Sequence, residues 1–242
     1  ETGIKHGTVT AAVEGKTYQI PSLRKDIKTD GRHAVVSFTD DWRKDALRRD
    51  FTINSLSATP EGIIYDYLDG LQDLSNHRIK FVGSAEKRIK EDHLRILRYF
   101  RFMATTGFKH DDEAMHQTCI DHSHLLSNLS GERIRDELFK ILVSENHNDT
   151  LGMMIRDGVT KQFLPEARDS ILIRKLIKVE RYVTQKEHLI VNPIRRLASL
   201  IYNDVIDISA LAKRLRISNK QFKHLKALLV PKWRATWNIS DN

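Results

Sequence analysis

The sequence has few of the features that mark secreted or membrane proteins. It contains one cysteine, Cys119, in 242 residues, so no internal disulfide can form. This scarcity fits a reducing compartment and predicts a cytoplasmic location. No apolar run approaches the roughly 18 residues of a membrane span. The first residues do not form a charged-then-apolar leader, so neither a membrane nor secretion is expected. Charged residues at 30% and hydrophobic residues at 40% are typical of a soluble globular protein.

Acidic residues are missing from one long stretch near the end of the sequence. The chain carries a net charge of +8, and residues 208–240 contain no Asp or Glu. Each phosphate that such a segment neutralises would release counterions, so nucleic acid is the favoured partner. A solvated basic tail is the alternative. The stretch holds eight basic residues, namely Lys213, Arg214, Arg216, Lys220, Lys223, Lys226, Lys232 and Arg234.

The first part of the sequence predicts strands. β-Branched runs at 7–13, 16–23 and 33–38 are separated by turn residues, and 62–70 reads as a short strand that ends in a turn. Residues 40–50 read as a short helix capped by Asp40 or Asp41. So few strands leave the edges of a sheet open. We therefore expect residues absent from this sequence, or another polypeptide, to complete the sheet.

The pattern becomes helical from Ser84. Residues 84–107 predict one helix, with Ser84 as its cap and Gly107 at its end, and further helices follow as far as residue 229. The expected fold class is α+β, mostly α, with a small sheet-bearing head followed by a helical body. Trp42, Trp233 and Trp237 are expected to pack in the interior rather than to stack on bases.

Residues 91–98, EDHLRILR, contain a carboxylate and a guanidinium three positions apart. On one helix Asp92 and Arg95 would be neighbours on the same face. A carboxylate only accepts hydrogen bonds and a guanidinium only donates them. The pair therefore complements the donors and acceptors on the pairing edges of cytosine and adenine. Uracil and guanine present donors and acceptors in the opposite order and would be mismatched. A mismatched buried polar group costs about 1–3 kcal/mol. Taken alone, a surface ion pair worth about 0.3–0.5 kcal/mol is the simpler interpretation.

Residues 48–54, RRDFTIN, bring together groups that suit a nucleotide. The adjacent arginines offer forked donors for phosphate oxygens. Asp50 and Asn54 can exchange hydrogen bonds with sugar hydroxyls. The alternative is a helix end with ordinary surface ion pairs.

Six motifs occur in one order and together resemble the class II tRNA nucleotidyltransferases, which include CCA-adding enzymes and bacterial poly(A) polymerases. The motifs are HGTVT (6–10), TDGRH (29–33), RRDFTIN (48–54), YDYLDGLQDL (65–74), EDHLRILRYFRF (91–102) and SGERIRDEL (130–138). NPIRRLASLI and LAKRLRISNKQF resemble the helical body of the same family. The resemblance implies a partial nucleotidyltransferase palm sheet in a head at 1–83, a neck with base-recognition helices at 84–145, and an all-helical, tRNA-binding body and tail at 146–242.

The resemblance also implies a reaction and a set of roles. Family members add C, C and A to tRNA 3′ ends from CTP and ATP, with Mg²⁺. By the resemblance, Asp92 and Arg95 pair with the incoming base and Glu91 helps to hold them, while Arg98 lies near the nucleotide. The resemblance implies that Arg48, Asp50 and Asn54 bind the triphosphate and ribose. It also implies a flexible element at Asp30, Gly31 and Arg32, and support of the neck by Glu132 and Arg133. The residues implied to contact the tRNA are Lys213, Arg214, Arg216, Lys220, Lys223 and Lys226.

The sequence departs from the family where metal ligands are expected. Two-metal transfer needs carboxylates, which in the family come mainly from an Asp-x-Asp segment ahead of HGTVT, and this sequence has none. Gln19 stands where a third carboxylate is common. Asp26, Asp30 or Asp50 could approach a metal, but no spacing requires it, so no catalytic residue or metal ligand is assigned. The polypeptide is interpreted as a fragment, as a subunit whose partner carries the Asp-x-Asp, or as a degenerate relative, and by itself it is expected to add no nucleotide.

Two other functions compete with CCA addition. Poly(A) polymerases share these motifs. A non-catalytic nucleic-acid-binding module is the second alternative, because residues 208–229 superficially resemble a helix-turn-helix. Binding of CTP or ATP would favour the transferase, whereas binding of duplex DNA without nucleotide affinity would favour the module. CCA addition is preferred because Asp92 and Arg95 suit both bases and the body is short.

Overall fold

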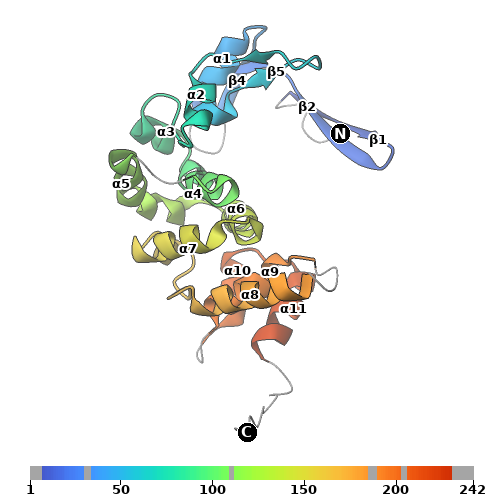
Figure 1. Cartoon of the computed structure of the whole chain (residues 1–242), viewed down its shortest axis with the longest axis vertical. Coiled ribbons are helices and arrows are strands. Elements are labelled where there is room, and N and C mark those ends of the chain that lie inside the picture. Colours follow the sequence, from blue (N-terminus) through green and yellow to red (C-terminus); the bar gives the residue numbers. More distant parts are fainter. Residues whose placement is uncertain (1–6, 30–33, 109–111, 185–189, 203–205, 231–242) are drawn as a thin grey trace, which may run out of the picture. The chain divides into compact units, whose positions relative to one another are not determined.

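The computed structural model describes residues 7–29, 34–108, 112–184, 190–202 and 206–230 (Figure 1). Helices dominate these residues and the strands are short, which confirms the α+β, mostly α class. The chain divides into two compact units, each described by itself below. Unit 1 comprises Glu1–Tyr99 and Phe108–His122, and unit 2 comprises Phe100–Gly107 and Ser123–Asn242. The predicted boundaries at 83 and 145 stay predictions.

The strands of unit 1 pair in twos. Among the described residues they form three separate antiparallel ladders rather than the one partial palm sheet expected from the sequence. The ladders are β1 (Thr8–Val13) with β2 (Lys16–Pro21), β3 (Arg24–Thr29) with β4 (Ala34–Phe38), and β5 (Ser57–Ala58) with β6 (Ile64–Tyr65). The strands predicted at 7–13, 16–23 and 33–38 are confirmed. The sequence did not reveal β3, because four of its six residues are charged or polar and lack strand preference.

Two helices of unit 1 begin at side-chain caps that the sequence predicts. Asp41 caps α1 (Trp42–Leu47) by accepting hydrogen bonds from the backbone nitrogens of Arg43 at 2.9 Å and Lys44 at 3.2 Å. Ser84 likewise caps α3 (Ala85–Glu91). The other helical elements of unit 1 are the 3-10 turn η2 (Thr52–Asn54), α2 (Gly70–Ser75), the beginning of α4 (Leu94–Thr106), and α5 (Glu113–Asp121).

The expectation of one helix over 84–107 is wrong, because the chain breaks between α3 and α4. Asp92 adopts an extended conformation with φ −154° and ψ 107°. Its carboxylate Oδ1 accepts a hydrogen bond from the backbone nitrogen of Leu94 at 3.1 Å. Aspartate favours such local bonds over helix continuation. Asp92 and Arg95 therefore lie on either side of a helix start rather than on successive turns of one helix.

The core of unit 1 fixes the segment that carries Asp50. The rings of Phe51 and Phe81 are both buried, with centroids 4.7 Å apart. The backbone nitrogen of Thr52 donates to the carbonyl of Lys80 at 3.0 Å, and the nitrogen of Val82 donates to the carbonyl of Asp50 at 2.9 Å. Residues 50–52 are thus held against residues 80–82 by ring packing and backbone hydrogen bonds.

Unit 2 is helical throughout its described part, as predicted. Its helix α9 (Pro193–Ile201) contacts α6 (Gly131–Val143), α8 (Ile171–Thr184) and α11 (Asn219–Leu229). The other helical elements are η3 (Ser123–Asn128), α7 (His147–Arg156), η4 (Thr160–Gln162) and α10 (Ile208–Arg214). None of the helices in the described ranges combines the length and the apolar character that a bilayer crossing requires.

A buried ion cluster joins three helices of unit 2. The Glu180 carboxylate is 3% exposed and lies on α8. It accepts from the Nε of Arg195 and from the Nε of Arg196, each at 2.8 Å, and both arginines belong to α9. Arg196 also donates through Nη1 to the carbonyl of Leu142 in α6 at 2.6 Å. The cluster therefore orients α9 against its neighbours.

Replacing Glu180 with alanine is expected to destabilise unit 2 by about 3–5 kcal/mol, because buried Arg196 would lose the one carboxylate with which it pairs among the described residues. Urea unfolding followed by circular dichroism measures the loss. Glu86→Ala is the matched control, since Glu86 pairs with Lys90 on an exposed face and such pairs contribute about 0–1 kcal/mol. Equal effects of the two substitutions would contradict the structural role of the cluster.

Candidate functional site

An ion pair joins the two stretches that the sequence singled out, 48–54 and 91–98. The Asp50 carboxylate, 5% exposed, accepts a hydrogen bond through Oδ2 from the Nε of Arg98. Its other oxygen, Oδ1, accepts from the side-chain nitrogen of Asn54 at 2.9 Å and from the backbone nitrogen of Phe51 at 3.1 Å. Asp50 therefore holds Asn54 and Arg98 at the same point of unit 1.

The environment of Asp50 favours its ionised form. Burial opposes ionisation, but the hydrogen bond and charge of Arg98, with smaller contributions from Asn54 and the Phe51 nitrogen, outweigh it. The pKa of Asp50 is therefore lowered from its ordinary value. A carboxylate that stays charged keeps the Arg98 guanidinium in place.

Asp45 is a site residue that the sequence analysis missed. This aspartate of α1 is 3% exposed, and it accepts from Nη2 of Arg48 at 2.6 Å through Oδ1 and from Nη2 of Arg49 at 3.0 Å through Oδ2. The Nη1 group of Arg48 makes no hydrogen bond with another described residue. Asp45 thus fixes both arginines. Its spacing of three and four residues from them on a helix end was the signal that could have revealed it.

Glu91 binds two arginines near the second stretch, 91–98, as Asp45 does near the first. Its Oε2 accepts from Nη1 of Arg95 at 2.7 Å and from Nη1 of Arg88 at 2.8 Å. The sequence analysis did not assign Arg88, which also donates through Nε to the carbonyl of Val82 at 2.8 Å. Glu91 thereby ties the end of α3 to the start of α4, and it contacts Arg95 as the resemblance implies.

Some N–H groups of the Arg95 side chain are hydrogen-bonded within unit 1, and others have no acceptor among the described residues. Its Nη1 donates to Glu91 and, at 3.0 Å, to the carbonyl of Arg88, while Nη2 donates to the carbonyl of Arg48 at 3.3 Å. Within the described residues, the Nε–H and the second Nη2–H have no acceptor. Because a guanidinium has five N–H donors in a plane, these two are available to a further acceptor. Asp92 precedes α4, the helix of Arg95, and its backbone carbonyl accepts from the Arg95 backbone nitrogen at 3.0 Å.

Six of the predicted nucleotide-binding residues are thus linked by hydrogen bonds within unit 1, and Asp92 adjoins them. They are Arg48, Asp50, Asn54, Glu91, Arg95 and Arg98. Asp30, Gly31 and Arg32, predicted as a flexible element, lie outside the described residues. The functional roles of all these residues stay predictions.

The predicted tRNA-binding and neck residues belong to unit 2, where two of the basic residues have acidic partners. Nη2 of Arg214 lies 2.5 Å from Oε1 of Glu166, and Nε of Arg216 lies 3.8 Å from Oε1 of Glu132. The turn after α10 also contacts the start of α6, where a Cβ on Gly131 would lie 1.9 Å from the Arg214 carbonyl oxygen. Glu132 thus lies at the start of α6, next to this turn. Of the six predicted tRNA-binding residues, four are exposed and have no ion pair to any described residue, namely Lys213, Lys220, Lys223 and Lys226.

The described residues do not fit a magnesium ion. No three His, Cys, Asp or Glu side chains lie together there as metal ligands would. The Asp50 carboxylate is taken by Arg98, Asn54 and the Phe51 nitrogen. The side chains of the other two metal candidates, Asp26 and Asp30, lie outside the described part. Gln19 lies on β2, opposite Thr10.

Acidification is expected to destabilise unit 1. Burial disfavours the charged forms of Asp45, Asp50 and Glu91, but their arginine partners outweigh it, and the pKa of each carboxyl is lowered. The unfolded chain then binds protons more readily than the folded one, so this stabilisation is fully present above about pH 5 and is lost as the pH falls below about 4. The free energy of unfolding measured from pH 7 to pH 3 checks this, with Glu91→Gln expected to flatten the curve. A constant value over that range would contradict it.

Two family models match the sequence, and together they cover more than half of it. The model described as "Poly A polymerase head domain" matches residues 1–80. The model described as "Probable RNA and SrmB- binding site of polymerase A" matches residues 111–171. The first match contains the 48–54 stretch and the second contains Glu132 and Arg133.

Curated relatives match nearly the whole chain. "CCA tRNA nucleotidyltransferase 1, mitochondrial" of Homo sapiens is 41% identical over 231 residues, which are 94% of this chain and 51% of the relative. The Danio rerio protein of the same name is 38% identical over 232 residues, covering 94% and 52%. "CCA-adding enzyme" of Lactococcus lactis is 32% identical over 246 residues, covering 99% and 60%. The chain thus spans about half the length of the first two relatives.

Solved structures share the fold. The crystal structure of the Bacillus stearothermophilus CCA-adding enzyme in complex with CTP matches with a TM-score of 0.73 and 28% identity, over 94% of this chain and 54% of that one. An apo form of a CCA-adding enzyme matches with a TM-score of 0.71 and 20% identity, over 91% and 54%. Both matches include the two units described above.

Proposed function

Because the chain belongs to the family of class II tRNA nucleotidyltransferases, which comprises CCA-adding enzymes and bacterial poly(A) polymerases, we propose that it selects the nucleotide and binds the tRNA in an enzyme that adds CCA to tRNA 3′ ends from CTP and ATP. One observation carries the proposal. Glu91 holds the Arg95 guanidinium, two of whose N–H donors have no acceptor among the described residues, and Asp92 lies at the start of the same helix.

The donor fork of Arg95 supports recognition of a base edge. Two parallel N–H groups suit the carbonyl and ring nitrogen acceptors of cytosine, and the neighbouring Asp92 carboxylate accepts from its exocyclic amino group. Adenine offers an amino donor beside a ring nitrogen acceptor. Because the Arg95 side chain is only 11% exposed, a base with the opposite order of donors and acceptors would leave buried polar groups unpaired, at about 1–3 kcal/mol each.

The stretch 48–54 supports binding of the triphosphate and ribose. Asp45 presents Arg48 with its Nη1 group unoccupied by the described residues, which suits a phosphate oxygen. The side-chain carbonyl of Asn54 is likewise without a partner there, and it can accept from a ribose hydroxyl. Asp50 acts through these groups, since both of its oxygens are already engaged.

Binding of the four nucleoside triphosphates tests the proposal. The enzyme that carries this chain together with its Asp-x-Asp palm segment is expected to bind CTP and ATP and to discriminate against UTP and GTP by about 10-fold or more. Poly(A) polymerase, the rival within the family, requires selection of ATP over CTP. Isothermal titration with each triphosphate separates the two. Equal affinity for all four would contradict both.

The basic residues of α10 and α11 are proposed to contact the tRNA backbone, chiefly through the lysines that have no acidic partner among the described residues. Replacing Lys220, Lys223 and Lys226 together with alanine is expected to weaken tRNA binding and to reduce the slope of log affinity against log salt by about 2–3. A filter-binding series from 50 to 300 mM salt measures this slope. The matched control replaces three exposed lysines elsewhere in unit 2, namely Lys161, Lys175 and Lys178. An equal reduction of the salt slope in the control variant would refute the assignment.

The remaining parts of the assignment concern the whole protein. We propose that Mg²⁺ serves the transfer step through carboxylates outside the described residues, and that a palm segment or separate polypeptide supplies them. The cytoplasmic location also stays a prediction, because two of the relatives carry the word mitochondrial in their names.

A further inference from the structure

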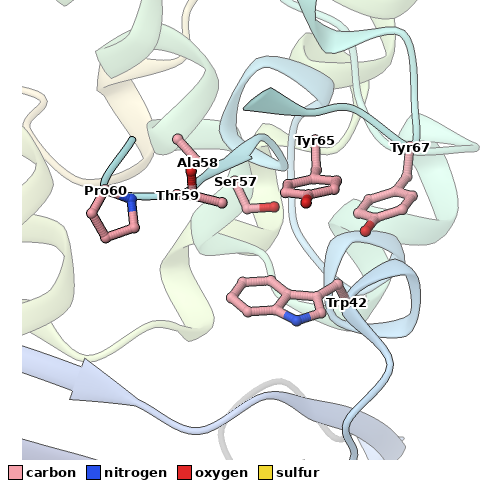
Figure 2. Close-up of a pocket in the computed structure, with 7 residues that line it drawn as sticks. All are labelled: Trp42, Ser57, Ala58, Thr59, Pro60, Tyr65 and Tyr67. Atoms are coloured by element: carbon pink, nitrogen blue, oxygen red, sulfur yellow. The ribbon is translucent and has the colours of Figure 1, made fainter. Parts of the chain in front are cut away.

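Unit 1 also contains a pocket that lies outside the set of residues described above. It is a cavity of about 440 Å³ (Figure 2). Trp42, the first residue of α1, lies on one side, and the phenol rings of Tyr65 and Tyr67 lie on the other. Ser57, Ala58, Thr59 and Pro60, from β5 and the turn after it, complete the lining.

The lining of the pocket suits a flat, uncharged aromatic ring. Among the described residues it contains three aromatic side chains and no charged residue. Trp42 is 53% exposed, so the sequence-based expectation that it packs in the interior is wrong. The hydroxyls of Ser57, Tyr65 and Tyr67 make no hydrogen bond with another described residue. Exposed rings beside a few unoccupied polar groups are typical of ligand pockets, and every nucleobase has a π-face that stacks on such rings.

The pocket and the candidate nucleotide site share two structural elements. Helix α1 begins at Trp42 and ends at Leu47, next to Arg48. Six residues of helix span about 9 Å. The second shared element is β5, which lines the pocket and begins three residues after Asn54. A base in the pocket would therefore lie within reach of a nucleotide bound by Arg48 and Asn54.

We propose that this pocket binds the unpaired nucleobase at the 3′ end of the RNA strand that receives the new nucleotide. The proposal rests on the nucleotidyltransferase function above, because the accepting 3′ end must then lie next to the incoming triphosphate. The terminal base of this RNA strand changes with every addition. Stacking tolerates all bases, whereas hydrogen-bond recognition by the lining would favour one. The described lining also has no cation that would attract the phosphate groups.

Equilibrium binding of RNA to the full-length enzyme, without triphosphate, tests this proposal independently of turnover. The probes are two RNA hairpins that differ only at the unpaired 3′-terminal nucleotide, which is intact in one and abasic in the other. The wild type is expected to bind the intact hairpin about 5- to 100-fold more tightly. In Trp42→Leu and in Tyr65→Leu this ratio should approach one. Tyr202→Leu is the matched control, an aromatic residue of unit 2 that is 50% exposed and should keep the wild-type ratio.

Besides a wild-type ratio of one, two results would overturn the proposal. One is an intact-to-abasic ratio that persists in both pocket variants while circular dichroism shows them folded. The other is a Trp42 that acrylamide does not quench in the RNA-free enzyme, because another segment would then fill the pocket. CTP affinity is measured in the same samples. A wild-type enzyme that does not bind CTP would overturn the proposed function. A wild-type enzyme that binds CTP but shows an intact-to-abasic affinity ratio of one would overturn only the proposed role of the pocket.

Discussion

Asp50→Ala is expected to lower the free energy of unfolding of unit 1 by about 3 kcal/mol. The substitution removes the carboxylate that accepts from Arg98, Asn54 and the Phe51 nitrogen. Breaking a buried ion pair costs about 3–5 kcal/mol, and the lower end applies because the Arg98 side chain is 27% exposed to water. Hydrogen exchange of unit 1 amides, combined with urea unfolding, measures the change. CTP affinity should fall with it, since Asn54 and Arg98 lose their common anchor.

A second substitution separates the loss of the ion pair from the loss of packing. If the unpaired Arg98 guanidinium causes most of the cost, then adding Arg98→Met to Asp50→Ala should recover part of the lost stability, because no buried charge remains. A double variant no more stable than Asp50→Ala would show that the cost arises elsewhere. Asp41→Ala is a useful control, since loss of this helix cap costs about 1 kcal/mol and leaves the ion pair intact.

Arg95→Ala is expected to abolish most of the discrimination between CTP and UTP. The fork on Arg95 and the carboxylate of Asp92 each contribute a matched hydrogen-bonding group, worth about 1–3 kcal/mol or roughly 10- to 100-fold in relative affinity. Asp92→Asn is the more informative change. An amide both donates and accepts, so this variant should admit UTP while it retains CTP.

The control for these variants is His93→Ala, which alters the residue between Asp92 and the first residue of α4 without removing either recognition group. It should keep the wild-type ratio of CTP to UTP affinity, measured by titration. A ratio unchanged in Arg95→Ala and Asp92→Asn would contradict base recognition by this pair. Arg95→Lys should behave like the alanine variant, because an ammonium group lacks the planar fork.

Local chemistry made much of the fold predictable. Capping at Asp41 and Ser84 and the helical spacing of apolar residues located the helices. The break at Asp92 escaped this reasoning because the apolar spacing continues from Ile89 to Ile96 across it. β3 was missed because its charged composition resembles a loop.

Individual site residues were predictable, but their partners were only partly so. Asp45 and its two arginines are neighbours on one helix end, and this spacing is visible in the sequence. The pairing of Asp50 with Arg98 joins residues 48 positions apart, so only the tertiary fold reveals it. The pocket at Trp42 likewise depends on residues from separate elements, and composition alone favoured burial of that ring.

The most direct test of base recognition by Asp92 and Arg95 is a crystal structure of the full-length enzyme with CTP. The account predicts that the cytosine edge lies about 2.7–3.2 Å from the Arg95 guanidinium and the Asp92 carboxylate, with the triphosphate directed toward Arg48. A cytosine bound away from both side chains, for example stacked against Trp42, would contradict it.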